Sequence, residues 1–171
     1  TTGACNIAMG VNALGAAITA MDSVAIGQGA LAGAMTSTSG TQGDNNIAIG
    51  KAAAAAVTTG QNNIALGSNS ADAMTTGTSN ITMGVNAYGT AAAGHYNLAF
   101  GQTAMGGSLV TGQNNIALGT NAADALLAGA CNLAIGENAY GTAEAGSYNI
   151  ALGTTAMGGS LVTGTDNLAI G

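Results

Sequence analysis

A short motif that returns at steady intervals constrains this sequence more than any other feature. It reads Asn-[Ile/Leu]-Ala-[Ile/Leu/Met/Phe]-Gly, and its ten copies begin at Asn6, Ser23, Asn46, Asn63, Asn80, Asn97, Asn115, Asn132, Asn149 and Asn167. Two copies vary, because Ser23-Val24 opens the second and Thr82 replaces Ala in the fifth. Successive starting positions differ by 17 at six steps, by 18 at two, and by 23 at the step from Ser23 to Asn46. Repetition at so steady a period indicates an architecture in which each unit packs on its neighbours.

A longer repeat lies above the short one. Residues 61–112 and 113–164 align without gaps at an offset of 52, with 36 identical positions. This unit equals three short repeats, and it indicates internal duplication.

Each motif predicts a short strand. In Ile47-Ala48-Ile49 the two large side chains point to one face and the Ala points to the other. We expect the Ile/Leu/Met ladder to form the core and the Ala ladder to face a second thin core layer or another copy of the chain. After the motif Gly, where the chain bends or takes a positive φ, the stretch of small residues is expected to form a second strand.

A unit of about 17–18 residues is too short for a helix pair or a βα unit, and it fits one coil of a parallel β-solenoid. The Ala52–Ala56 run would favour helix by propensity, but its repeat register places it in a coil. The sequence therefore predicts an all-β fold with one domain over residues 1–171. We expect about ten coils, a rod roughly 45 Å long at the usual strand spacing, and a chain that is part of a longer one.

The Asn that precedes each strand is predicted to form a structural ladder along the axis. Stacked amides can hydrogen-bond to one another and satisfy backbone groups in turns. The ladder residues are Asn6, Asn46, Asn63, Asn80, Asn97, Asn115, Asn132, Asn149 and Asn167, with an interruption at Ser23.

The long interval between Ser23 and Asn46 indicates an insertion near residues 34–43. Ser, Thr and Gly dominate it, which predicts a surface loop that leaves the coil stack intact. We interpret it as a tolerated insertion, with a receptor contact as the alternative; the contact residues would be Thr36, Ser37, Thr38, Ser39, Thr41 and Gln42.

The charge balance excludes several classes of protein. Seven acids stand against one base, Lys51, so the formal net charge is −6, and a nucleic-acid partner is not expected. No apolar run approaches the length of a transmembrane helix, so no membrane insertion is expected. Cys5 and Cys131 occupy the same repeat position and lack CxxC spacing, so we expect two small buried residues, with a bond between chains as the alternative.

No pattern in the sequence indicates catalysis, a cofactor or a metal. His95 is the single histidine, and its counterpart in the next copy of the longer repeat is Ser147. Asp72 and Asp124 are equivalent positions three coils apart, which does not make a carboxylate pair. The repeats of calcium-binding β-rolls and the P-loop pattern are absent from the sequence. We therefore expect no enzyme.

The pattern Asn-Ile-Ala-Ile-Gly-x-x-Ala resembles the head repeats of trimeric autotransporter adhesins and the repeats of phage tail fibres. The matching cores are Asn46 to Gly50, Asn63 to Gly67 and Asn115 to Gly119, and the resemblance covers essentially the whole chain. It implies a left-handed parallel β-roll, three chains side by side, and a role in attachment to a host or surface. The repeat of the adhesin heads is shorter than the present one, which favours the fibre type.

These observations lead us to expect a structural fibre segment or attachment protein, extracellular, at a cell surface or on a virion. Its partners would be copies of itself, with a trimer favoured, and a host-surface receptor or glycan. A subunit of a self-assembling extracellular filament is the alternative. An ice-binding solenoid and a hexapeptide acyltransferase fit less well, because the Thr ladder is mixed and the apolar repeat occurs once per coil.

Overall fold

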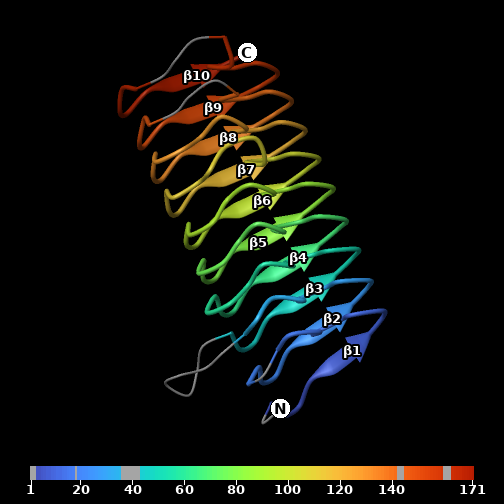
Figure 1. Cartoon of the computed structure of the whole chain (residues 1–171). Helices are drawn as coiled ribbons and strands as arrows, with labels where there is room; N and C mark the ends of the chain where they lie inside the picture. The colour runs from blue at the N-terminus through green and yellow to red at the C-terminus, as the bar shows by residue number, and fades with distance from the viewer. Residues whose placement is uncertain (1–2, 18, 36–42, 142–144, 160–162) are drawn as a thin grey trace.

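The computed structural model describes residues 3–17, 19–35, 43–141, 145–159 and 163–171. These residues form a β-solenoid, in which the chain winds through stacked coils that each contribute one short strand (Figure 1). The described residues contain no helix. The strands are β1 (Ile7–Met9), β2 (Val24–Ile26), β3 (Ile47–Ile49), β4 (Ile64–Leu66), β5 (Ile81–Met83), β6 (Leu98–Phe100), β7 (Ile116–Leu118), β8 (Leu133–Ile135), β9 (Ile150–Leu152) and β10 (Leu168–Ile170).

All ten strands form one parallel sheet in sequence order, from β1 to β10. The register follows the motif, so that Ile47 pairs with Ile64 and Ala48 with Ala65. The longer interval between β2 and β3 leaves this register unchanged, because Val24 pairs with Ile47. The predicted all-β parallel solenoid, with one motif in each coil, is confirmed.

The core lies on the side of the sheet opposite to the one predicted. The central Ala of an inner strand is buried, as Ala48 and Ala117 show, whereas Ile49 and Ile116 beside these residues are 41% and 38% exposed. The physical reason is space, because coils that wind this tightly leave room inside the sheet for a small side chain only, which is Ala or, in β5, the buried Thr82. The Ala ladder is therefore the core ladder, and the large aliphatic side chains point outward.

The predicted second strand is replaced by a turn. After each motif Gly the described chain runs through turn residues, and positive φ returns at alternate positions, as at Asn86 (φ 55°) and Tyr88 (φ 56°). A parallel strand requires φ of about −120°, so these residues cannot pair as one. Coil-to-coil backbone hydrogen bonds still form here, since Asn86 N donates to Ser68 O at 3.0 Å.

Larger residues from the turns fill the rest of the interior. In each of these coils one large and one small residue share the interior. The large residue comes first in one coil, with Tyr88 before Ala91, and second in the coil before it, with Met74 after Ala71. All four side chains are buried. Tyr140 repeats the Tyr88 position, and its hydroxyl donates to Gly146 O at 3.1 Å.

The motif Gly residues let successive coils approach closely. Gly84 has φ +136°, a value that residues with a Cβ atom rarely adopt. A Cβ added there would lie 2.4 Å from Gly101 O in the next coil. The Gly column thus fixes the distance between coils at the end of every strand.

Candidate functional site

The outer face of the sheet carries two columns of large apolar side chains. One column takes the first residue of every strand and the other takes the third, and together we call them the aliphatic face. The first column is Ile7, Val24, Ile47, Ile64, Ile81, Leu98, Ile116, Leu133, Ile150 and Leu168; the second is Met9, Ile26, Ile49, Leu66, Met83, Phe100, Leu118, Ile135, Leu152 and Ile170.

None of these twenty side chains is buried. In the inner coils the more open members, such as Ile116 and Ile135, are each 38% exposed, and the others are half-buried by their neighbours. Exposed polar residues border both columns, including Asn62 and Asn114 before the strands and Gln102 and Thr120 after them. The face is thus a continuous apolar strip with mostly polar margins, although the exposed Val11 and Val85 occupy the same repeat position as Gln102 and Thr120.

The Asn ladder runs inside the coils beside the strands. Asn63 N and Nδ2 both donate to Asn46 Oδ1, at 3.0 and 3.1 Å, and Asn63 Nδ2 also donates to Gly77 O at 2.8 Å. The backbone part of this pattern repeats up to Asn167, whose N donates to Asn149 Oδ1 at 2.9 Å. The Asn63 side chain therefore accepts through its oxygen from Asn80 N in the following coil, and donates through its nitrogen to the coil before and to the carbonyl of Gly77.

Ser23 continues this ladder, although the sequence suggested an interruption. Ser23 N donates to Asn6 Oδ1 at 3.0 Å, and Ser23 Oγ accepts from Asn46 N at 3.2 Å. A hydroxyl can accept and donate at once, so Ser23 passes the hydrogen bond on and also donates to Met21 O at 3.1 Å.

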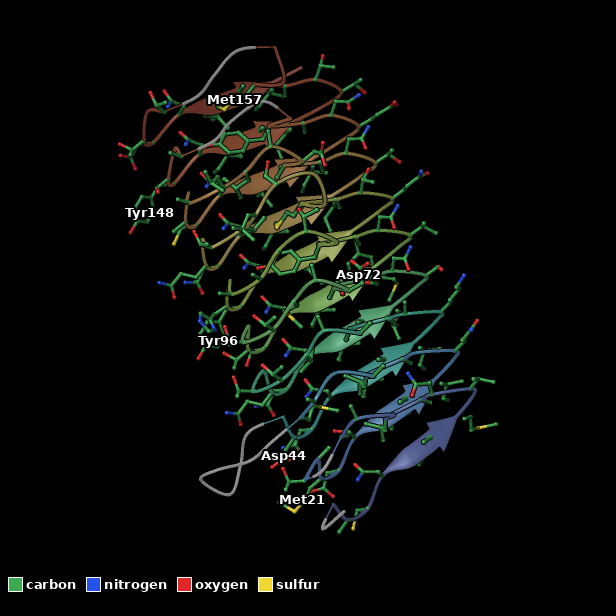
Figure 2. The ribbon with its side chains drawn as sticks, viewed as in Figure 1. Met21, Asp44, Asp72, Tyr96, Tyr148 and Met157 are labelled. Carbon is green, nitrogen blue, oxygen red and sulfur yellow. The ribbon has the colours of Figure 1, made fainter. Side chains whose placement is uncertain are left out.

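The side chain two residues before a ladder Asn can also accept a hydrogen bond from the backbone of the coil before it. Asp44 Oδ1 accepts from Met21 N at 2.9 Å, and the two residues lie together at the same end of neighbouring coils (Figure 2). His95 Nδ1 accepts from Thr78 N at 3.1 Å, and Ser147 Oγ accepts from Ala130 N at 3.1 Å. His95 thus has the same structural contact as its counterpart Ser147.

Asp72 and Asp124, whose spacing in the sequence did not indicate a carboxylate pair, border one hollow. It has a volume of about 370 Å³ and is also lined by Asn86, Thr90 and Thr103. The two coils between the acids carry Gly89 and Gly106 at the equivalent position, and the missing side chains leave the space. The order at this position in successive coils, Asp72, Gly89, Gly106 and Asp124, was the sequence signal that could have found it.

Burial changes the acid–base properties of these groups. Desolvation raises the pKa of Asp72 and of Asp124, and nearby backbone N–H groups partly offset the shift. Asp124 Oδ1 is buried without a hydrogen-bond partner. Burial also raises the pKa of Tyr140, although a hydrogen bond from Asn149 opposes this shift.

The cysteines differ from the prediction. Cys5 is exposed and Cys131 is half-buried, so neither is a buried core residue, and neither forms a disulfide in this chain. They share the column of the exposed Tyr96 and Tyr148, which project from the edge of the coils (Figure 2). This position takes positive φ in these coils, with Cys131 at 58°, and the turn directs its side chain away from the core.

The predicted contact residues Thr36, Ser37, Thr38, Ser39, Thr41 and Gln42 lie outside the described residues. Within the described part of the chain, three or more His, Cys, Asp or Glu side chains do not gather in a way that could hold a metal ion. The described residues also contain no helix long and apolar enough to cross a membrane.

Comparisons of the chain with family models, with curated proteins and with solved structures gave no match.

Proposed function

We propose that this chain is a rigid segment of an extracellular or virion fibre, acting as a shaft or attachment head. The observation that carries the proposal is the unbroken register of the sheet, in which ten strands pair in sequence order across the long interval between Ser23 and Asn46. Such a stack transmits force through many parallel backbone hydrogen bonds. The proposed role is mechanical and assigns no catalytic step.

The segment works, in this proposal, as a homo-oligomer, with three chains favoured by the resemblance to fibre and adhesin repeats. Thin coils bury little apolar surface, because Ala supplies most of the sheet's inner side. Lateral association would supply further stability. The partner at the distal end would be a host-surface receptor or glycan.

Light scattering of the purified chain across a dilution series, with electron microscopy of the same sample, tests this proposal. We expect rods of uniform width and a fixed mass of a small number of chains. A monomer at every concentration would contradict the oligomer, and compact particles would contradict the fibre. Slow digestion by trypsin is also expected, because Lys51 is the single Lys or Arg.

A self-assembling filament is the second candidate. Every coil presents its strand to the next in the same register, so a coil of another chain could continue the stack. A strand edge without a partner can pair with another chain. Rods whose length increases with concentration would favour this candidate over a segment of fixed length.

A further inference from the structure

We infer that the aliphatic face is the surface by which copies of this chain associate, so that the same faces of neighbouring copies lie against one another. This inference rests on the proposed homo-oligomer and adds which residues form its interface. It follows from the outward direction of the large side chains, which the alternation along the strands alone did not reveal.

The first step is the composition of the face. All twenty positions carry Ile, Leu, Val, Met or Phe, and no polar or charged residue interrupts either column over ten coils. The same chain carries polar side chains at exposed positions nearby, such as Asn114 and Thr120. A contiguous apolar patch of this kind typically marks an interaction surface.

The second step is the size of the face. Ten strands about 4.8 Å apart give a length of about 45 Å, and two columns about 7 Å apart give a width of about 11 Å with their side chains. One chain therefore offers roughly 500 Å², and two such faces in contact would bury about 1,000 Å². That area reaches the level expected of a specific interface before the polar margins are counted.

The third step is the identity of the partner. A complementary surface must be straight, apolar and about 45 Å long, and it must repeat at the strand spacing. The aliphatic face of another copy has all of these properties. Because the face carries no charge, stacking it on itself brings no like charges together. The polar residues on both sides would form the rim of the interface.

The test uses two Lys substitutions in the middle of the face. Ile81→Lys and Ile116→Lys together place two charges in the proposed interface, on side chains that are 40% and 38% exposed. The control is Ala73→Lys with Ala128→Lys, which makes the same charge change at exposed positions in the turns. Mass is measured by light scattering across a dilution series, and folding by circular dichroism.

We expect the control to keep the mass of the unsubstituted chain. The double substitution in the face should raise the concentration of half-dissociation by about a hundredfold or more, because a buried unpaired charge opposes association. If the Lys variant does not fold, Ile81→Thr with Ile116→Thr keeps the β-branched shape and should weaken association by at least about tenfold.

Three outcomes would overturn the inference. A monomeric unsubstituted chain would overturn it together with the homo-oligomer. An oligomer that both face variants leave unchanged would overturn this interface alone and leave the homo-oligomer standing. A monomer that binds vesicles of zwitterionic lipid through this face would assign the face to a membrane surface.

Discussion

Replacement of one Asn in the middle of the ladder tests whether the ladder holds the coils together. Asn80 Oδ1 accepts from Asn97 N at 2.9 Å, and Asn80 Nδ2 donates to Gly94 O at 2.8 Å and to Asn63 Oδ1 at 3.2 Å. Asn80→Ala removes these three bonds. It leaves Asn97 N and Gly94 O buried without any other partner that the structure shows.

The cost follows from those two groups. A buried donor or acceptor that loses its partner costs about 1–3 kcal/mol, so Asn80→Ala should lower the free energy of unfolding by about 2–6 kcal/mol. Asn63 Oδ1 retains Asn80 N at 2.9 Å and therefore adds little.

Asn80→Asp gives a sharper form of the test, because its shape is nearly the same. One carboxylate oxygen still accepts from Asn97 N, but the other would face Gly94 O and Asn63 Oδ1, which are also acceptors. Burial and these acceptors would raise the pKa of the new carboxyl in the folded state above its unfolded value. Stability should therefore be lost as the pH rises through the folded pKa, and regained in acid, where the protonated oxygen can donate to Gly94 O.

Urea unfolding at fixed chain concentration, at pH 7 and pH 4, measures these effects. Asn114→Asp is the control, because it makes the same charge change at an exposed position. Equal stability of Asn80→Asp and Asn114→Asp at pH 7 would refute the role assigned to the ladder.

Three further predictions concern the coil spacing, the core and the partly buried Asp124. Gly84→Ala should destabilise the fold by about 3 kcal/mol or more, because its Cβ would meet Gly101 O and its φ is unfavourable; Gly159→Ala, where a Cβ meets nothing within 4 Å, should cost less than about 1 kcal/mol in the same urea assay. Tyr88→Phe removes the hydroxyl that accepts from Asn97 Nδ2 at 2.8 Å and should lower the free energy of unfolding by about 1 kcal/mol. Tyr96→Phe at an exposed position should leave the stability unchanged, and equal melting temperatures of the two variants would contradict the role of the Tyr88 hydroxyl. Burial raises the pKa of Asp124 in the folded state, so stability should fall as the pH rises through that pKa, and Asp124→Asn should flatten the urea-derived pH profile between pH 4 and pH 7.

The sequence predicted the architecture because the signal is repeated in every coil. The position of each strand, the pairing of like residues and the tolerance of the long interval all follow from the spacing of the motif. Two step lengths that differ by a single residue both close one coil, as the pairs Ile81–Leu98 and Leu98–Ile116 show. Periodicity of this kind leaves little freedom for another fold.

The direction of the side chains could not be read from the alternation alone. In Ile47-Ala48-Ile49 either the Ala or the two Ile residues can face inward, and both choices keep the same register. The close approach of the coils decides which side chains face inward. It is evident at Gly84, where an added Cβ would lie 2.4 Å from Gly101 O in the next coil. Large residues in the turns, Tyr88 and Met105 among them, fill the interior in place of the strand residues.

The turn that stands in place of the predicted second strand has a signal in the sequence, the recurrence of Asn at fixed positions. Asn tolerates positive φ better than most residues, and it recurs two residues after the motif Gly, as at Asn69 and Asn121, where φ is 55° and 54°. It also recurs just before the ladder Asn, as at Asn45 and Asn62, with φ 58° at both. Asn at fixed repeat positions therefore indicated turns with positive φ.

The Asn ladder has a direction. In each rung the oxygen accepts from the coil that follows in the chain, and the backbone N–H donates to the coil before, as at Asn115, Asn132 and Asn149. Every side-chain dipole in the column is therefore aligned the same way, and the two ends of any stretch of coils differ chemically. A stack could be lengthened only head to tail, because head-to-head contact would bring donors to donors or acceptors to acceptors. A rod built on this ladder would be polar, with two chemically different ends.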